Sequence, residues 1–398
     1  MSDIVISALS DVLEKVILPS VERNVYEKSA MMQLFFGYSP EKQEAVRKNA
    51  MGVTFQNDKV YFTVLTDLNP SAMGYAEDET LRSGKSTTAQ GYLPIATVAG
   101  STTISKQALN IKNKGAIVNI VQFETTNLIN SLAMEINRQI YGDGSGTVAT
   151  TATSGSNTTS IPLSASTNGD IDYSEYFPLG TYIKVGSSLA VKVVGKSTNS
   201  LTVDNAISYN AGDPIKKVTG SGTTATELTG LAKIVKDSDT YANINPSTYP
   251  VWKAYVDSTA EALSLSKMHK AYYKANKLGS VDYIFMNQTL FQKYGTLLEG
   301  KIQFQAKDVL YGGWKGITYM GGLATVVLDY MCPDDRVYFL SSKKLVGMEY
   351  QPFEFEKGTD GNLLRIANKL SYELVASWMG QVGTFVRGAH AVLTNKTA

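Results

Sequence analysis

The chain has 398 residues, of which 43% are apolar, so it is long enough to bury a sizeable core and to form more than one domain. Its 37 basic and 36 acidic residues leave a formal net charge of +1, which argues against bulk attraction to nucleic acid or to an anionic membrane. The single cysteine excludes an internal disulfide, no run is long and apolar enough to cross a membrane, and no signal peptide is expected at the N-terminus.

The first 50 residues show weak helical periodicity and are interpreted as an N-terminal arm. Within it, the segment 31–36 is apolar, and Met31, Leu34 and Phe35 have no obvious local partner. Two explanations are open. Either the arm packs on another part of an assembly, which makes these three residues candidate contacts between subunits, or a helix here returns to the chain's own core.

Residues 51–107 combine strand patterns with a polar stretch. Apolar residues alternate from 53 to 64, which predicts two strands, and strand character returns over 92–104. The stretch 69–91 between them is polar, and a structureless loop of that length is unusual in a compact domain. We therefore predict a long hairpin that projects from the body and, being poorly stable alone, lies on a neighbour such as another subunit. Its candidate contacts are Arg82, Lys85 and Tyr92.

The longest helical pattern runs from residue 114 to residue 141, inside a predicted segment 108–146. Apolar residues recur every three, four or seven positions along it, at Ile117, Val121, Leu128, Leu132, Ile136 and Ile140. Polar residues, among them Asn137 and Gln139, fill the other side of the helix. At about 1.5 Å per residue the helix spans roughly 40 Å, and its single apolar stripe must pack on something, most simply a sheet.

Residues 147–225 are predicted to form an inserted all-β domain. The stretches 147–159 and 218–226 are rich in Thr, Ser and Gly and are interpreted as flexible joints. Short strand patterns bounded by turn residues lie between them, at 182–185, 190–194 and 201–203. A small barrel fits this pattern.

Residues 226–345 predict a compact α/β domain. Its expected helices cover 260–276 and 288–298, and its expected strands cover 281–286 and several pieces of 316–339. The last segment, 346–398, is strand-rich and is expected to return to the sheet under the long helix.

No constellation of residues predicts catalysis. His269 and His390 have no nucleophile and orienting acid placed beside them in the sequence. The segment 83–87 resembles the end of a phosphate loop, but Glu79 stands where that loop needs glycine. The acidic turn 170–175 lacks the glycine and the spacing of a calcium loop. We therefore predict no enzyme, no cofactor and no metal site.

The remaining reactive or aromatic residues are interpreted structurally. Cys332 has no His or Cys partner nearby in the sequence. Trp252, Trp314 and Trp378 suit core or interface anchors better than a ligand cage, and the first two are candidate contacts between subunits. For Lys85, an exposed solubilising role is preferred to a covalent bond with a neighbouring subunit.

The order of these parts resembles the major capsid protein of tailed bacteriophages, which has the Hong Kong 97-like fold. The arm, the strand–polar hairpin–strand unit and the long helix, which begins at Asn113-Lys114-Gly115-Ala116 and ends in Gly142-Asp143-Gly144-Ser145-Gly146, carry the resemblance. Further similar segments are Thr229-Gly230-Leu231, Tyr241-Ala242-Asn243-Ile244-Asn245, Ser247-Thr248-Tyr249-Pro250 and Ala391-Val392-Leu393-Thr394-Asn395.

The resemblance implies an α+β fold with defined domains. The long helix in 108–146 would be the spine of the peripheral domain, and 346–398 would supply that domain's return strands. Residues 51–107 would be the extended hairpin loop that overlaps adjacent subunits. Residues 226–345 would be the axial domain, whose tips meet at capsomer centres, and 147–225 would be an insertion outside the common fold.

The resemblance also implies a function. The chain would assemble with copies of itself into hexamers and pentamers of an icosahedral shell around double-stranded DNA, with weak, non-specific DNA contact. Portal, scaffolding and decoration proteins would be its other partners, and no membrane would be involved. It would act in the virion, after assembly in the host cytoplasm. No crosslinking residues are assigned.

Other classes of protein stay open at this point. An encapsulin-like bacterial compartment shell would share the fold, although the insertion and the arm count against it. A secreted β-rich adhesin or glycan-binding protein could be built around residues 147–225, against which stands the missing signal peptide. An enzyme is disfavoured by the missing catalytic constellation.

Overall fold

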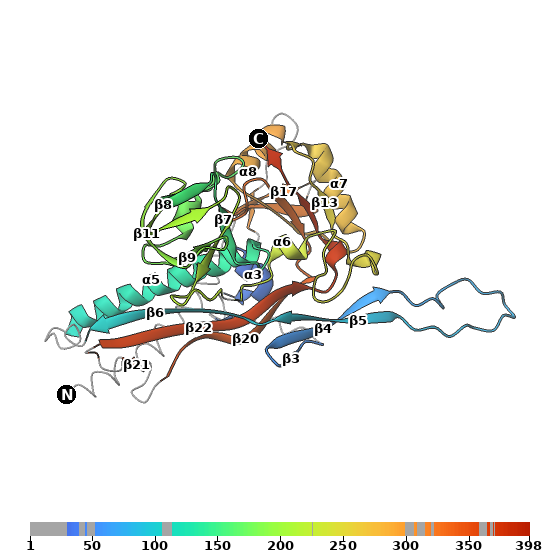
Figure 1. Cartoon of the computed structure of the whole chain (residues 1–398). Coiled ribbons are helices and arrows are strands. Elements are labelled where there is room, and N and C mark those ends of the chain that lie inside the picture. The colour runs from blue at the N-terminus through green and yellow to red at the C-terminus, as the bar shows by residue number, and fades with distance from the viewer. Residues whose placement is uncertain are drawn as a thin grey trace.

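The structure of the chain is a computed structural model. It describes residues 30–39, 44–45, 52–105, 114–224, 226–298, 306–308, 315–319, 322–357, 364–366, 369 and 371–398. In this part of the chain, a long helix lies on a long sheet, a hairpin projects from one end of that sheet, and a barrel and a mixed α/β region sit on the same side as the helix (Figure 1).

Helix α5 (Lys114–Tyr141) packs along an antiparallel sheet, as its single apolar stripe predicts. The strands of this sheet are β6 (Ala96–Ser105), β20 (Leu345–Phe355), β21 (Leu364–Arg365) and β22 (Ser371–Thr384). Strand β22 is the central strand: it pairs with β6 from Ser105 to Ala96 on one side and with β20 and β21 on the other, so segments far apart in sequence are neighbours in the sheet. Leu132, Ile136 and Ile140 are buried against it. The stripe residues Ile117 and Val121 lie outside the side chains that the structure describes.

The polar side of α5 is covered near its C-terminal end. Asn137 and Gln139 are both buried, and so is Arg138 between them. The segment around Glu227 and the inserted domain cover the helix on this side.

The predicted hairpin is present. Strands β3 (Thr54–Gln56) and β4 (Lys59–Asp67) are joined by Asn57 and Asp58, whose φ angles of +49° and +55° suit a two-residue hairpin turn. Strand β4 then pairs with β5 (Thr87–Pro94). The intervening residues 68–86 continue outward beyond the paired strands as a long loop (Figure 1).

The inserted domain is a closed six-stranded antiparallel barrel. Its strands are β7 (Thr147–Thr150), β8 (Gly155–Pro162), β9 (Tyr182–Val185), β10 (Val191–Ser197), β11 (Ser200–Tyr209) and β12 (Pro214–Val218), in the order β7-β12-β9-β10-β11-β8. A bridge between Thr151 and Leu163 joins the first strand of this order to the last. The interpretation of 147–159 as a flexible joint was wrong: this stretch forms β7 and most of β8, because barrel strands alternate inward apolar and outward polar residues and need few large side chains.

The mixed region holds a seven-stranded sheet in the order β13-β23-β19-β15-β18-β17-β16. Its strands are β13 (Tyr255–Asp257), β15 (Tyr283–Met286), β16 (Ala306–Asp308), β17 (Lys315–Tyr319), β18 (Ala324–Leu328), β19 (Val337–Leu340) and β23 (Ala391–Leu393). Helices α7 (Leu265–Asn276) and α8 (Gln288–Leu298) bury apolar faces in its core. We expected all of 346–398 to return to the sheet under α5, but β23 lies here, paired with β13 and β19.

Short elements complete the described fold. They are α3 (Ala30–Phe36), α6 (Leu231–Ile234), the 3-10 turns η2 (Tyr173–Tyr176), η3 (Pro250–Trp252) and η4 (Arg387–Ala389), and the two-residue strands β1 (Tyr38–Ser39), β2 (Glu44–Ala45), β14 (Glu261–Ala262) and β24 (Lys396–Thr397). Helix α3 is buried against β20, and Gly347 makes room for it: a Cβ there would lie 2.5 Å from the Phe36 ring. Of the two explanations for segment 31–36, the described fold has the return to the chain's own core.

Candidate assembly surfaces

The projecting loop is ordered by hydrogen bonds within itself. Asn69 Nδ2 donates to the carbonyl oxygen of Gly84 across the loop at 3.1 Å. Tyr75 Oη donates to Ser71 O at 3.0 Å and accepts the Arg82 N–H at 3.1 Å. These contacts hold the two sides of the loop together without a packed core, so the loop presents a defined surface to its surroundings.

Three large apolar side chains are exposed on this otherwise polar loop. Leu68 and Leu81 are each 76% exposed and Met73 is 57% exposed. Scattered exposed leucines are ordinary on a folded domain, but here they gather on one extension that has no core of its own. The described part of the chain does not cover these side chains.

The predicted contact residues fall into two groups. Arg82 and Lys85 are exposed on the loop, and Tyr92 is half-buried at its base, where Lys59 Nζ lies 4.4 Å from the centre of its ring. By contrast, Met31, Leu34, Phe35 and Trp252 lie inside the chain's own core.

The core packing of two predicted anchors is specific. The Trp252 ring stacks on Tyr241 with centroids 5.9 Å apart. Trp378 makes an edge-to-face contact with Phe36 at 5.5 Å. Trp314 lies outside the described residues. Contact between subunits stays a prediction for all eight predicted residues. The predicted contacts do not include the exposed Leu68 and Leu81, although both are visible in the sequence as large apolar residues in a polar stretch.

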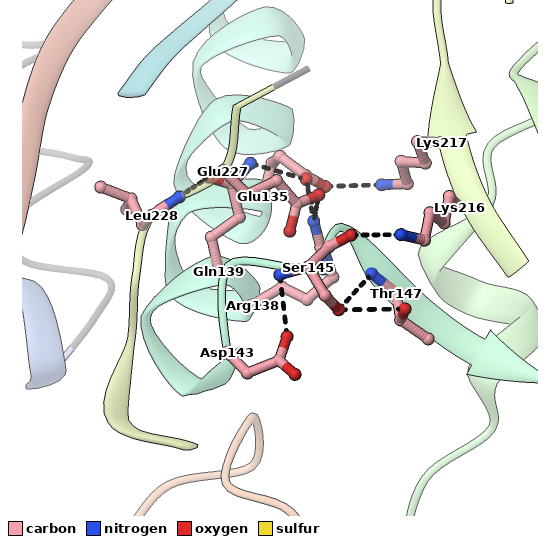
Figure 2. Close-up of polar contacts among 10 residues, drawn as sticks. All are labelled: Glu135, Arg138, Gln139, Asp143, Ser145, Thr147, Lys216, Lys217, Glu227 and Leu228. Atoms are coloured by element: carbon pink, nitrogen blue, oxygen red, sulfur yellow. Dashed lines mark hydrogen bonds and ion pairs between the residues drawn. The ribbon is translucent and has the colours of Figure 1, made fainter. Parts of the chain in front are cut away.

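A charged cluster joins α5 to the barrel (Figure 2). Arg138 Nη2 lies 2.5 Å from Glu135 Oε1 and 2.5 Å from Glu227 Oε1, and Lys217 Nζ lies 2.5 Å from Glu135 Oε2. Gln139 Nε2 also donates to Glu135 at 3.0 Å. Burial by itself would raise the pKa of Glu135, but Arg138 and Lys217 outweigh it and hold the pKa at about 2. Glu135 is thus ionised at neutral pH, and its ion pairs with Arg138 and Lys217, together with that of Arg138 and Glu227, join the helix, the barrel and the segment before α6.

A second contact fixes the barrel to the α/β region. Asp334 is buried, and its Oδ2 accepts the backbone N–H groups of Asn168 and Asp170 at 2.8 and 3.3 Å. The Asp170 carboxylate in turn accepts the N–H and the hydroxyl of Thr289, in the first turn of α8, at 2.9 and 2.6 Å. The acidic turn 170–175 is therefore a docking and helix-capping segment.

A buried arginine secures the C-terminal segment. Arg387 is fully buried and donates to four main-chain carbonyl oxygens, those of Lys233, Ile234, Ser238 and Asp239, at 2.9–3.0 Å. Burial lowers its pKa to about 10. The sequence offered no indication of this role, because main-chain acceptors leave no residue pattern.

The histidines and the cysteine, which could in principle take part in chemistry, make packing and hydrogen-bond contacts instead. His390 is buried, accepts the Ser341 N–H at Nδ1 at 3.3 Å, and lies 2.9 Å from Thr384 Oγ1 through Nε2. His269 is half-buried against the Tyr319 ring, and burial raises the pKa of the Cys332 thiol. Among the described residues, no group of three or more His, Cys, Asp or Glu side chains could hold a metal ion. Nor does any described helix have the length and apolar character to span a membrane.

Comparison with known proteins identifies the fold. Neither a family model nor a curated protein sequence matches the chain. The capsid asymmetric unit of cyanophage A-1(L) is similar in structure, with a TM-score of 0.54, 13% sequence identity, and coverage of 87% of this chain and 90% of that one. This likeness runs through nearly the full length of both chains. The chain therefore has a capsid-protein fold of the α+β class.

Two further structures are more distant. The capsid of the native GTA particle has a TM-score of 0.46 at 10% identity and covers 87% of this chain and 88% of its own. The holo-SrpI encapsulin complex of Synechococcus elongatus PCC 7942 has a TM-score of 0.44 at 9% identity and covers 84% of this chain and 82% of its own. The cyanophage capsid alone of these three carries the conclusion on the fold.

Proposed function

We propose that this chain is the major capsid protein of a tailed phage, with the Hong Kong 97-like fold. It assembles with copies of itself into hexamers and pentamers, and these close an icosahedral shell around the double-stranded DNA genome. The observation that carries the proposal is the near full-length likeness to a cyanophage capsid subunit. It is supported by the projecting hairpin, whose exposed leucines have no cover in the described chain.

In this proposal each part of the chain corresponds to a domain of a capsid subunit. Helix α5 and its sheet form the peripheral domain, and the hairpin of β4 and β5 overlaps an adjacent subunit. The seven-stranded sheet with α7 and α8 belongs to the axial domain, which meets its copies at the capsomer centre. The barrel is an insertion on this scaffold. The boundaries at residues 50, 107, 146, 225 and 345 stay predictions.

The partners follow from the same proposal. Contact with packaged DNA is weak and non-specific, because a net charge of +1 supplies little attraction for phosphates. Portal, scaffolding and decoration proteins are further partners. The chain acts in the virion and is assembled in the host cytoplasm, and it performs no catalysis.

Electron microscopy of the purified protein, with its mass measured by light scattering, tests the proposal. Closed shells, tubes, or hexameric and pentameric rings are expected. DNA is the expected content when the shells come from infected cells. A protein cargo inside the shells would replace the phage assignment by an encapsulin-like compartment. A monomer at every concentration and salt, also in the presence of co-expressed phage scaffolding protein, would overturn shell formation itself.

A further inference from the structure

The barrel has one docked end and one free end. The long connection between β8 and β9, which contains Asn168 and Asp170, lies at the end that contacts the α/β region. Because successive barrel strands are antiparallel, the loops 151–154, 186–190 and 210–213 all lie at the opposite end. In a barrel, a loop cluster on a rigid rim is a common place for a binding site.

These loops surround a cavity of about 430 Å³. Polar and apolar surface both contribute to its lining, which consists of Ser154, Gly155, Ser156, Ser187, Ser208, Tyr209, Asn210 and Asp213. Tyr209 forms the floor: its ring lies so close to Gly155 that a Cβ there would be 2.5 Å from Cζ, and its hydroxyl donates inward to Ser160 O at 2.7 Å. The cavity is within the size range of small-ligand sites.

Hydrogen bonds between the loops hold the rim in place without a ligand. Thr151 Oγ1 donates to Asn210 O at 2.6 Å, and Thr151 O accepts the Gly212 N–H at 2.9 Å. The Asn210 N–H donates to Asp213 Oδ2 at 2.8 Å. Two of the three loops are thus held in one arrangement. The surface is therefore preformed, and binding a ligand costs little free energy for ordering these loops.

Several polar groups at the rim keep unused hydrogen-bonding capacity. The hydroxyl oxygens of Ser154 and Ser208 accept the backbone N–H groups of Ala211 and Asn157, each at 3.0 Å, so their own O–H protons are free to be donated. Asp213 uses Oδ2 within the loop, and within the described chain its Oδ1 has no hydrogen-bond donor. The cavity therefore offers hydroxyl donors beside a carboxylate acceptor.

This arrangement selects the chemistry of the ligand. The lining holds no lysine or arginine, so a phosphate or another anion has no partner and would face Asp213. One carboxylate is too little for a metal ion, and a wholly hydrophobic ligand would leave the polar side-chain groups, which every lining residue except Gly155 carries, without partners. A neutral polyhydroxylated molecule both donates and accepts hydrogen bonds at neighbouring hydroxyls, which matches the lining. We propose that the free end of the barrel binds a neutral saccharide.

Saturation-transfer difference NMR on the full chain tests this inference. The probes are the methyl glycosides of glucose, galactose, mannose and N-acetylglucosamine, with N-acetylneuraminic acid as the anionic comparison. At least one neutral glycoside should receive saturation, and the anionic sugar should not. Ser187→Trp, at an exposed loop position, should abolish the signal by filling the cavity. Asn210→Ala should weaken binding about tenfold, as expected for the loss of about one hydrogen bond.

Ser197→Ala provides the matched control, because this exposed serine lies at the docked end of the barrel and should leave the signal unchanged. Circular dichroism confirms that each variant is folded. Absence of transfer to every neutral glycoside, a signal from the anionic sugar alone, or an unchanged signal in Ser187→Trp would each overturn the inference. The result is independent of shell formation, because the barrel can be probed in the free or the assembled chain.

Discussion

At the residue scale, the described fold depends on a few buried polar side chains that join distant segments. Arg387 ties η4 to α6 and to the segment that follows α6 through four carbonyl oxygens, and Arg138 ties α5 to Glu227. Such groups are costly to bury and become strongly destabilising when their partners are left unpaired. They are therefore the places where a single substitution should have the largest effect.

Arg387→Met should lower the free energy of unfolding by about 3 kcal/mol or more. Methionine fills much of the same space but leaves buried carbonyl oxygens without donors, and each such loss costs about 1–3 kcal/mol. Urea denaturation of the purified chain measures the change. Arg365→Met, at an exposed arginine, serves as the control and should change the stability by no more than about 0.5 kcal/mol. Equal effects of the two variants would contradict the role of Arg387.

His390 should make the chain less stable in mild acid. Burial lowers its pKa from about 6.5 to about 3, so the unfolded chain takes up a proton in this range while the folded chain does not. Stability is then complete above about pH 6.5 and falls by about 1.4 kcal/mol per pH unit between about 6.5 and 4.5. Glu135, held at a pKa of about 2, adds its own loss only below about pH 4.5.

Urea midpoints between pH 7.5 and 4.5 measure this slope. His390→Gln should flatten the pH dependence in that interval, even if the variant is less stable overall. His269→Gln leaves the buried imidazole in place and should keep the slope of the original chain. A slope that survives in His390→Gln would assign the acid sensitivity to other groups.

At the scale of single elements, the hairpin and α5 differ in how much burial within the chain stabilises them. Helix α5 is stabilised by burial on its own sheet, and Gly100 in β6 permits the close approach, since a Cβ there would lie 2.7 Å from Leu128 Cδ1. The loop of residues 68–86 has no comparable burial within the described chain. Its apolar side chains contribute little to the folded subunit, and we infer that their contribution comes on contact with a second copy.

The double variant Leu68→Ser, Leu81→Ser should fold normally and assemble poorly. Both leucines are 76% exposed, so the unfolding free energy of the subunit should change by less than about 1 kcal/mol. Shell yield, measured by light scattering and electron microscopy, should fall sharply. Leu189→Ser, at an 85% exposed leucine of the barrel, is the matched control and should leave assembly intact. Normal shells from the double variant would contradict the assembly role of the loop.

At the scale of the whole molecule, the barrel is a separate core attached to a continuous scaffold. Its interior has its own hydrophobic cluster. Its two connections to the scaffold lie side by side, because a Cβ on Gly146 would be 3.3 Å from Thr224 Cγ2. Adjacent ends allow an insertion to be removed without reconnecting the rest of the chain.

Replacing residues 148–223 by a short Gly/Ser linker should leave a scaffold that folds cooperatively. The lost contacts of Lys217 with Glu135 and of Asp170 with Thr289 should lower the unfolding free energy by about 1–3 kcal/mol. The shortened chain should still form shells and should lose saccharide binding. Calorimetry, electron microscopy and the NMR experiment check the three outcomes. A shortened chain that is unfolded at every temperature measured would show that the scaffold needs the barrel in order to fold.

Local patterns determined much of the fold. The helical patterns predicted α5 and α8 with the bounds that the structure has, and alternation predicted β3 and β4, because one element buries one face and its sequence records which face. The strand-rich segments 345–355 and 370–386 correspond to β20 and β22, whereas β5 begins at Thr87, inside the stretch interpreted as polar. The order of these elements was enough for a capsid-fold resemblance. Of the candidate contacts, the pattern correctly placed Arg82 and Lys85 on an exposed projection, whereas Met31, Leu34, Phe35 and Trp252 are buried.

The rest depended on contacts between segments far apart in the chain. The sequence by itself could not show that Asn137 and Gln139 are covered, that β23 joins the seven-stranded sheet, that Arg387 binds main-chain carbonyls, or that three separate loops enclose one cavity. Periodicity reports whether a side chain prefers water or an apolar environment. Only the packing of the whole chain decides which segment supplies that environment. Hydrogen bonds and buried faces join segments that are far apart in the sequence, and a local pattern cannot identify those partners.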